Sequence, residues 1–160
     1  MEQAIISGVT HDTSEAKVTI TQVPDKPGIA AFVFRHLADA DVNVDMIVQN
    51  VSTAGHTDIS FTIPKDDLAK TAPVMAVVVP EIGAAGYDED SDIGRVSLIG
   101  AGMKTHPGVA AIMFETLSTE GVNIEMISTS SIRISCVVRA ADVDRAVQSL
   151  HRAFDLEGAP

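Results

Sequence analysis

The stretch Pro-Gly-Ile-Ala-Ala at residues 27–31 returns 80 residues later as Pro-Gly-Val-Ala-Ala at residues 107–111. The same offset relates Val-Asn-Val-Asp-Met-Ile at 42–47 to Val-Asn-Ile-Glu-Met-Ile at 122–127. Because this offset is half of the 160-residue chain, the sequence is a duplicated module and not a short stacked repeat. Each copy has the size of a small domain of about 70–80 residues. Two copies of one module, neither with a catalytic constellation, indicate ligand sensing rather than chemistry.

The composition excludes several classes of partner. The net charge is −11, whereas nucleic acids and anionic membranes need a basic surface. The chain has no Trp and only 4% aromatic residues, so it offers no platform for stacking bases. No run approaches the ~18 uninterrupted apolar residues of a membrane helix, and the first residues lack the pattern of a signal peptide. We expect a cytoplasmic protein with no nucleic-acid or membrane partner.

Hydrophobic periodicity gives the order of elements in the first copy. Lys-Val-Thr-Ile-Thr-Gln alternates as a half-buried strand does, and Pro27-Gly28 then opens a helix with an apolar stripe. The predicted elements are a strand at 17–22, a helix from Pro27, strands at 43–52 and 56–63 around Gly55, a helix at 65–79 with Pro73 as a weak point, and a short edge strand at 87–90. The acidic run at 88–92 is also consistent with a solvated linker between the copies.

The second copy repeats this order without its last strand. Its predicted elements are a strand at 95–100, a helix at 107–120, strands at 124–128 and 132–139, and a helix at 142–154. The pattern β-α-β-β-α-β is ferredoxin-like, which makes the fold class α+β. A spare strand at 4–11 precedes the first copy, and we expect it to complete the second sheet. The predicted domains are therefore 15–92, and 93–160 completed by 4–11.

The two Pro-Gly turns are the candidate binding elements. A loop that enters a helix presents unpaired N–H groups and a positive dipole end, which suit a carboxylate or phosphate. The alternative is that Pro and Gly only start a helix. Asp25 precedes the first turn and could receive the ammonium of an amino acid, or act as an ordinary N-cap. Thr105 takes its place in the second turn, so we expect two unequal sites.

Other candidate groups give weaker signals. Asn43 and Asn123 are predicted to begin a strand in each copy, or to be turn residues before it. Gln49 lies further along the first of these strands. The five His residues show no metal spacing, and the lone Cys136 reads as a small buried hydrophobe rather than a reactive thiol. We expect no metal and no cofactor, since phosphate-loop and nucleophile-elbow motifs are also missing.

These segments together resemble a known family. Asp25-Lys26-Pro27-Gly28 and Met103-Lys104-Thr105-His106-Pro107-Gly108-Val109 are the most specific of them. With the segments 14–19, 42–52, 57–62, 96–102 and 123–130, they are similar to the regulatory half of actinobacterial-type aspartate kinase. The resemblance runs from about residue 5 to residue 154 and does not include the family's kinase domain.

The resemblance implies a tandem of two ACT domains that pairs with the tandem of another chain and binds amino acids at the junctions. In the family this half also exists as a separate β subunit beside a catalytic α subunit, and it mediates feedback inhibition by threonine and lysine. The implied threonine-type site comprises Asp25, Lys26, Pro27, Gly28, Ile29, Ala30 and Gln49, with Asn123 and Ile124 of the facing domain. The implied second junction comprises Met103, Thr105, His106, Pro107, Gly108 and Val109 with Asn43, Val44 and Asp45.

One departure from the family concerns lysine. Ser131 stands where the family is expected to have Glu, and an ε-ammonium prefers an acidic partner. The expected function is thus a non-catalytic subunit that binds threonine, with lysine left open, partnered by a catalytic α subunit or by a second copy of itself. A specialised stand-alone ACT amino-acid sensor is the alternative.

Two other readings of the topology fit less well. An acyl-phosphate hydrolase of ferredoxin-like fold needs Arg on its phosphate loop, and neither Pro-Gly turn contains one. An RNA-binding module needs paired aromatic residues on its central strands and a basic face, whereas the predicted strands carry Val48, Asn50, Ser60 and Thr62.

Overall fold

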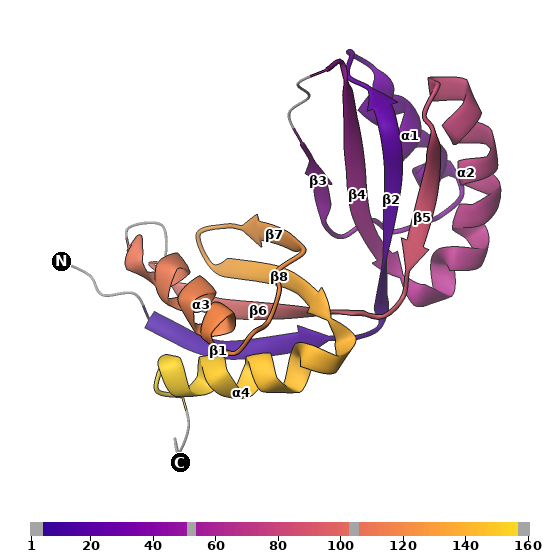
Figure 1. Ribbon diagram of the computed structural model, residues 1–160. Coiled ribbons are helices and arrows are strands. Elements are labelled where there is room, and N and C mark those ends of the chain that lie inside the picture. Colours follow the sequence, from indigo (N-terminus) through magenta and orange to yellow (C-terminus); the bar gives the residue numbers. More distant parts are fainter. Residues whose placement is uncertain (1–4, 51–53, 103–105, 157–160) are drawn as a thin grey trace. The chain divides into compact units, whose positions relative to one another are not determined.

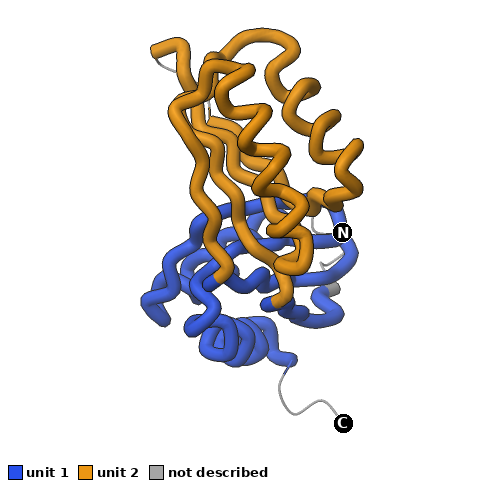
Figure 2. The backbone as a smooth tube through the Cα atoms, turned by 90° about the vertical axis from the view of Figure 1, so that its right-hand side faces the viewer, with its two compact units in different colours: residues 1–13, 92–160 blue, residues 14–91 orange. Residues whose placement is uncertain are grey.

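The computed structural model describes residues 5–50, 54–102 and 106–156. The chain divides into two compact units, one formed by residues 14–91 and the other by residues 1–13 together with 92–160 (Figure 2). Each unit has its own hydrophobic core and a β-α-β-β-α-β arrangement. The expected pair of ferredoxin-like folds is therefore confirmed.

The unit of residues 14–91 is continuous in sequence. Its elements are β2 Glu15–Pro24, α1 Ile29–Asp39, β3 Ile47–Gln49, β4 His56–Pro64, a 3-10 turn at Lys65–Asp67, α2 Leu68–Ile82 and β5 Gly86–Asp90 (Figure 1). Within the described residues its antiparallel sheet has the order β3-β4-β2-β5. Both helices cover the same face of this sheet (Figures 1 and 2).

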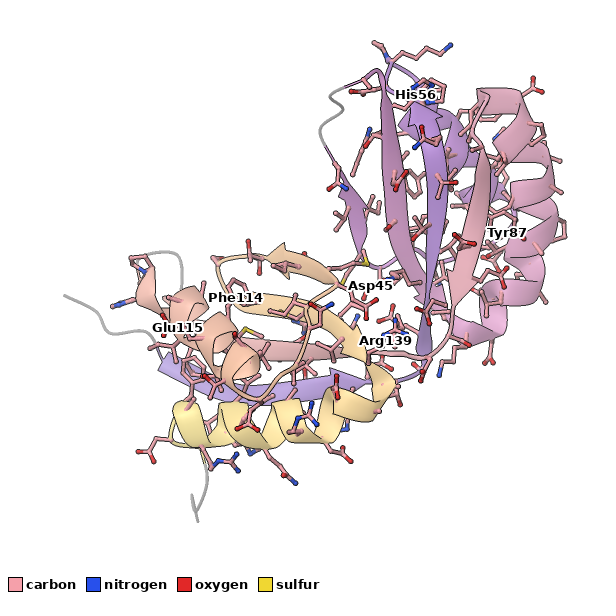
Figure 3. All side chains as sticks on the ribbon, in the orientation of Figure 1. Asp45, His56, Tyr87, Phe114, Glu115 and Arg139 are labelled. Atoms are coloured by element: carbon pink, nitrogen blue, oxygen red, sulfur yellow. The ribbon has the colours of Figure 1, made fainter. Side chains whose placement is uncertain are left out.

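Alternation along β2 explains this one-sided core. Val18 and Ile20 are fully buried, while Thr19 between them is half-buried and its hydroxyl lies 2.9 Å from that of Ser60 on β4. The helices contribute one buried stripe each, with Ile29, Val33 and Leu37 from α1 and Thr71, Met75, Val78 and Ile82 from α2. Tyr87 of β5 packs against the same core beside α2 (Figure 3).

The other unit is discontinuous. It contains β1 Ile5–Asp12, β6 Ile93–Ala101, α3 Gly108–Thr119, β7 Met126–Thr129, β8 Arg133–Arg139, a 3-10 turn at Ala140–Asp142 and α4 Val143–Ala153. In the part that the structure describes, the sheet order is β1-β6-β8-β7. The leading strand β1 pairs antiparallel with β6, from Ile5 opposite Ala101 to Asp12 opposite Arg95. The prediction that this strand completes the second sheet is confirmed.

Several predicted boundaries were wrong. Asn43 and Asn123 do not begin strands, because β3 starts at Ile47 and β7 at Met126. Ladder-like backbone bonds nevertheless precede each strand. They run from the Asp45 amide to the Thr62 carbonyl and from the Thr62 amide to the Met46 carbonyl in one unit, and from the Glu125 amide to the Val137 carbonyl in the other. Both Asn residues therefore lie in the connection between helix and strand, which was the alternative.

The second helix differs from prediction, and the acidic run follows only one of its two predictions. The helix begins with a 3-10 turn and continues to Ile82 through Pro73 and Pro80. Both prolines are exposed, and the buried stripe on the opposite side holds the helix together despite the backbone bonds that they remove. Residues 88–90 are paired with β2 as part of β5, which confirms the predicted edge strand at 87–90, and they form a charged sheet edge and not a linker. Such charges disfavour edge-to-edge association of strands.

Cys136 lies fully buried in β8. Burial away from water disfavours the thiolate and raises the pKa of this thiol to about 12. The interpretation of Cys136 as a core residue is confirmed. No helix in the described ranges is long and apolar enough to cross a bilayer.

A close approach between β6 and α4 yields the first prediction. A Cβ atom at Gly94 would overlap Cγ2 of Val143, the first residue of α4, and would also press on Thr13. Gly94→Ala is therefore expected to lower the free energy of unfolding by about 1–3 kcal/mol, the usual cost of overpacking. The control is Gly86→Ala on β5, where the added methyl meets nothing within 4 Å. Urea denaturation measures both, and equal stability of the two variants would contradict the close approach.

Candidate functional site

The first Pro-Gly turn joins the end of β2 to α1. Gly28 is the N-cap residue of α1 and has φ 93°, a left-handed conformation that only glycine adopts at little cost. No described side chain caps this helix end, and the first helical bond runs from the Phe32 amide to the Gly28 carbonyl at 3.0 Å. The amides of the first turn of α1 are therefore available to an anionic group.

A pocket of about 340 Å³ opens at this turn. It lies between the start of α1 and the last turn of α2, and its lining comprises Lys26, Pro27, Gly28, Ile29, Phe32, Glu81 and Ile82. Four of these residues were predicted as site residues. Glu81, Ile82 and Phe32 were missed. Glu81 in particular comes from a helix whose end was predicted three residues too early, so no local signal could place it at the turn.

The other residues that the prediction takes for this site from the same domain lie outside the pocket. Asp25, Ala30 and Gln49 are all exposed, and none of them lines a described pocket. The Asp25 amide donates to the Gly55 carbonyl at 2.9 Å, which ties the turn to the start of β4. Because Gly28 is the N-cap, the alternative role of Asp25 as an ordinary N-cap is wrong. Its carboxylate thus has no helix-capping function here.

The second Pro-Gly turn has a different backbone. Pro107 is the N-cap residue of α3 in a right-handed conformation, and Gly108 is already helical without a positive φ. A pocket of about 540 Å³ adjoins it, lined by His106, Pro107, Val109, Ala110, Thr129, Ser130, Ser131 and Ile134. Met103 and Thr105, predicted for this site, lie outside the described residues.

This second pocket lies between the start of α3 and the turn between β7 and β8. The Ser130 amide donates to the Arg133 carbonyl at 2.7 Å and closes that turn. Thr129, Ser130 and Ser131 then give the wall hydroxyl groups, and its described lining contains no carboxylate. Ser131, where the family is expected to have Glu, is thus part of the pocket wall.

Asn123 and Ile124 line a third pocket, of about 400 Å³, at the end of α3. Phe114 of α3 forms its apolar side and packs against the core (Figure 3). The corresponding residues of the other unit, Asn43, Val44 and Asp45, lie on the connection between α1 and β3. The structure therefore places each of these groups at the same point of its own unit.

The chemistry available at these sites is recognition. An uncapped helix start with Lys26 nearby suits a carboxylate, and Glu81 suits an ammonium. Within the described ranges, no three His, Cys, Asp or Glu residues gather as metal ligands would.

Comparison with known proteins agrees with this architecture. The sequence model of the ACT-domain family matches this chain at residues 18–76 and again at residues 96–154. The aspartokinase of Mycolicibacterium smegmatis is 51% identical over 160 residues, which are 99% of this chain and 38% of that protein. The chain thus spans well under half the length of this relative.

Two solved structures match over nearly their whole length. The ligand-free regulatory subunit of aspartate kinase from Thermus thermophilus is 37% identical with a TM-score of 0.90, covering 94% of this chain and 99% of that one. A chain from a structure of aspartokinase alpha and beta subunits is 42% identical with a TM-score of 0.88 and the same coverage. Sequence, fold and duplication agree: this chain belongs to the ACT-domain family, as a tandem of two ACT repeats homologous to the regulatory region of aspartokinase.

Proposed function

We propose that this chain is a non-catalytic regulatory component of aspartate kinase that binds threonine and mediates feedback inhibition. The observation that carries this proposal is the first Pro-Gly turn, where an uncapped helix start, Lys26 and Glu81 surround one pocket. These groups match the carboxylate and ammonium of an α-amino acid. Titration of the purified chain with threonine by calorimetry tests it, and no heat at millimolar threonine would contradict it.

The proposed partner is a catalytic subunit of aspartate kinase. The chain covers only 38% of its Mycolicibacterium smegmatis relative, so the phosphotransfer activity is assigned to a part of the enzyme outside this sequence. Two solved relatives are described as a regulatory subunit and as alpha and beta subunits, which supports a role beside a catalytic chain.

The proposed site is completed at a junction between ACT domains. Asp25, Gln49 and the turn would come from one domain, and Asn123 and Ile124 from the facing domain of a second chain. Exposure of Asp25, Ala30 and Gln49 is compatible with cover by another chain. The second junction would be completed in the same way by residues of the facing domain, namely Asn43, Val44 and Asp45. They would lie opposite the second Pro-Gly turn at residues 106–109.

Inhibition then follows from differential affinity. Threonine that binds the inhibited assembly more tightly than the active one shifts the equilibrium between them. A coupling free energy of about 1–3 kcal/mol is typical and corresponds to roughly 5–150-fold. Lysine is the second proposed ligand, and Ser131 in the wall of the second pocket supports a weaker response to it.

The second prediction concerns Asp25. Asp25→Ala is expected to weaken threonine binding by about 1.5–3 kcal/mol, the range for a hydrogen bond to a charged group. The melting temperature should stay unchanged, because Gly28 and not Asp25 is the N-cap of α1. Calorimetry measures the threonine affinity and thermal unfolding measures the melting temperature. The control is Asp88→Ala, which removes another exposed carboxylate. A lower melting temperature with unaltered affinity would contradict the ligand role.

The third prediction concerns assembly. The isolated chain is expected to dimerise, and threonine bound across the junction should tighten the dimer by mass action. Sedimentation velocity over a dilution series, with and without threonine, measures this, and acetate, which lacks the ammonium group, is the control in place of threonine. A monomer that binds threonine at full affinity would contradict the shared junction.

A further inference from the structure

The pocket at the first Pro-Gly turn carries opposite charges on opposite walls. Lys26 stands on the turn before α1, and Glu81 is the next-to-last residue of α2. In the described part of this unit, Arg35 pairs with Asp39 and Lys70 pairs with Asp41 and Asp67, whereas Lys26 and Glu81 take part in no ion pair. Both side chains are exposed, so a cation and an anion at the rim of one cavity are accessible to a ligand that carries both charges.

The helix dipoles reinforce this separation of charge. The pocket lies where α1 begins and α2 ends, so a positive helix end and a negative helix end border the same cavity. The positive end lies on the side of Lys26 and the negative end on the side of Glu81. A zwitterion has one favoured orientation in such a field, with its carboxylate toward α1 and its ammonium toward α2.

The end of α2 holds Glu81 in a defined place. Gly83 adopts φ 75° and its amide donates to the Pro80 carbonyl at 3.2 Å, while the Ala84 amide donates to the Val79 carbonyl at 3.0 Å. The next residue, Ile82, is only 7% exposed and anchors the last turn in the core. The carboxylate therefore stands on a fixed helix turn and not on a loop.

The rest of the pocket is apolar. Ile29, 8% exposed, and Ile82 line it together with Phe32. Phe32 is held by the ring of His36, with centroids 4.2 Å apart. A cavity of about 340 Å³ with this lining has room for a small amino acid.

We propose that Glu81 receives the ligand ammonium at the first Pro-Gly turn and is the residue that selects α-amino acids over carboxylic acids without an ammonium group. This inference rests on the proposed function as an amino-acid sensor and assigns a residue to its site. Asp25 does not line this pocket, so the contributions of the two carboxylates are separable by mutation. The second Pro-Gly pocket has no carboxylate in its described lining, and the selection therefore belongs to the first turn.

The experiment compares two ligands that differ in the ammonium group. Threonine and 3-hydroxybutyrate, which keeps the carboxylate and the hydroxyl group, are titrated by calorimetry into the full chain. Glu81→Gln is expected to weaken threonine binding about tenfold or more, the usual effect of losing a hydrogen bond to a charged group. Its affinity for 3-hydroxybutyrate should stay the same or rise, so the ratio of the two affinities falls. Glu81→Asp should restore part of the ratio.

Controls separate this role from a structural one. Glu89→Gln removes an exposed carboxylate from β5, outside the pocket lining, and should leave the ratio unchanged. Melting temperatures of all variants should match that of the wild type. If the wild type binds threonine but Glu81→Gln leaves the ratio of the two affinities unaltered, the role of Glu81 is overturned and the proposed function is not. An equal loss of affinity for both ligands in Glu81→Gln has the same meaning. No binding of threonine to the wild type overturns the proposed function and this inference with it.

Discussion

The antiparallel ladder between β1 and β6 is the interaction on which this architecture depends. In the described residues, which end at 156, no strand follows α4, and the side of β6 away from β8 is paired with β1, which precedes the first repeat in sequence. An ion pair at 3.5 Å between Arg95 and Asp12 closes one end of this ladder. Without β1, a central strand of the unit would become an edge with unpaired amides and carbonyls. The sheet of the second repeat is therefore completed by a strand that lies on the other side of the first repeat in the sequence.

The two repeats share the same fold, but their Pro-Gly turns differ. Each sheet carries a hydroxyl pair between its central strands, Thr19 with Ser60 at 2.9 Å and Ser97 with Ser135 at 2.7 Å. The Pro-Gly turns, in contrast, differ in backbone, because Gly28 is left-handed and Gly108 is helical. One turn consequently borders a helix end with two charges, and the other borders a hairpin turn rich in hydroxyl groups. Nearly identical local sequence thus borders two pockets with different linings.

The fold could be predicted from the sequence because its signals are local or repeated. The 80-residue offset, the alternation in β2 and the stripes of the helices gave the order of elements, and the missing last strand pointed to β1. The beginnings of β3 and β7 could not be predicted, since Asn43 and Asn123 suit a turn as well as a strand. Pro73 and Pro80 obscured the length of α2, whose stability comes from buried Met75 and Val78. Glu81 could not be predicted as a site residue, because it lies beyond the predicted end of α2. Only the packing of α2 beside α1 brings it to a turn more than fifty positions earlier in the chain.

The order of strands has a consequence for biosynthesis. Residues 14–91 form a continuous unit that lies, in sequence, between β1 and the rest of the other unit. Chains fold as domains while they are made, with the N-terminal parts first. The continuous unit can thus fold as soon as β5 has left the ribosome, whereas β1 must wait until β6 is made. The discontinuous unit is completed last, and its exposed leading strand is the part of the nascent chain most in need of protection.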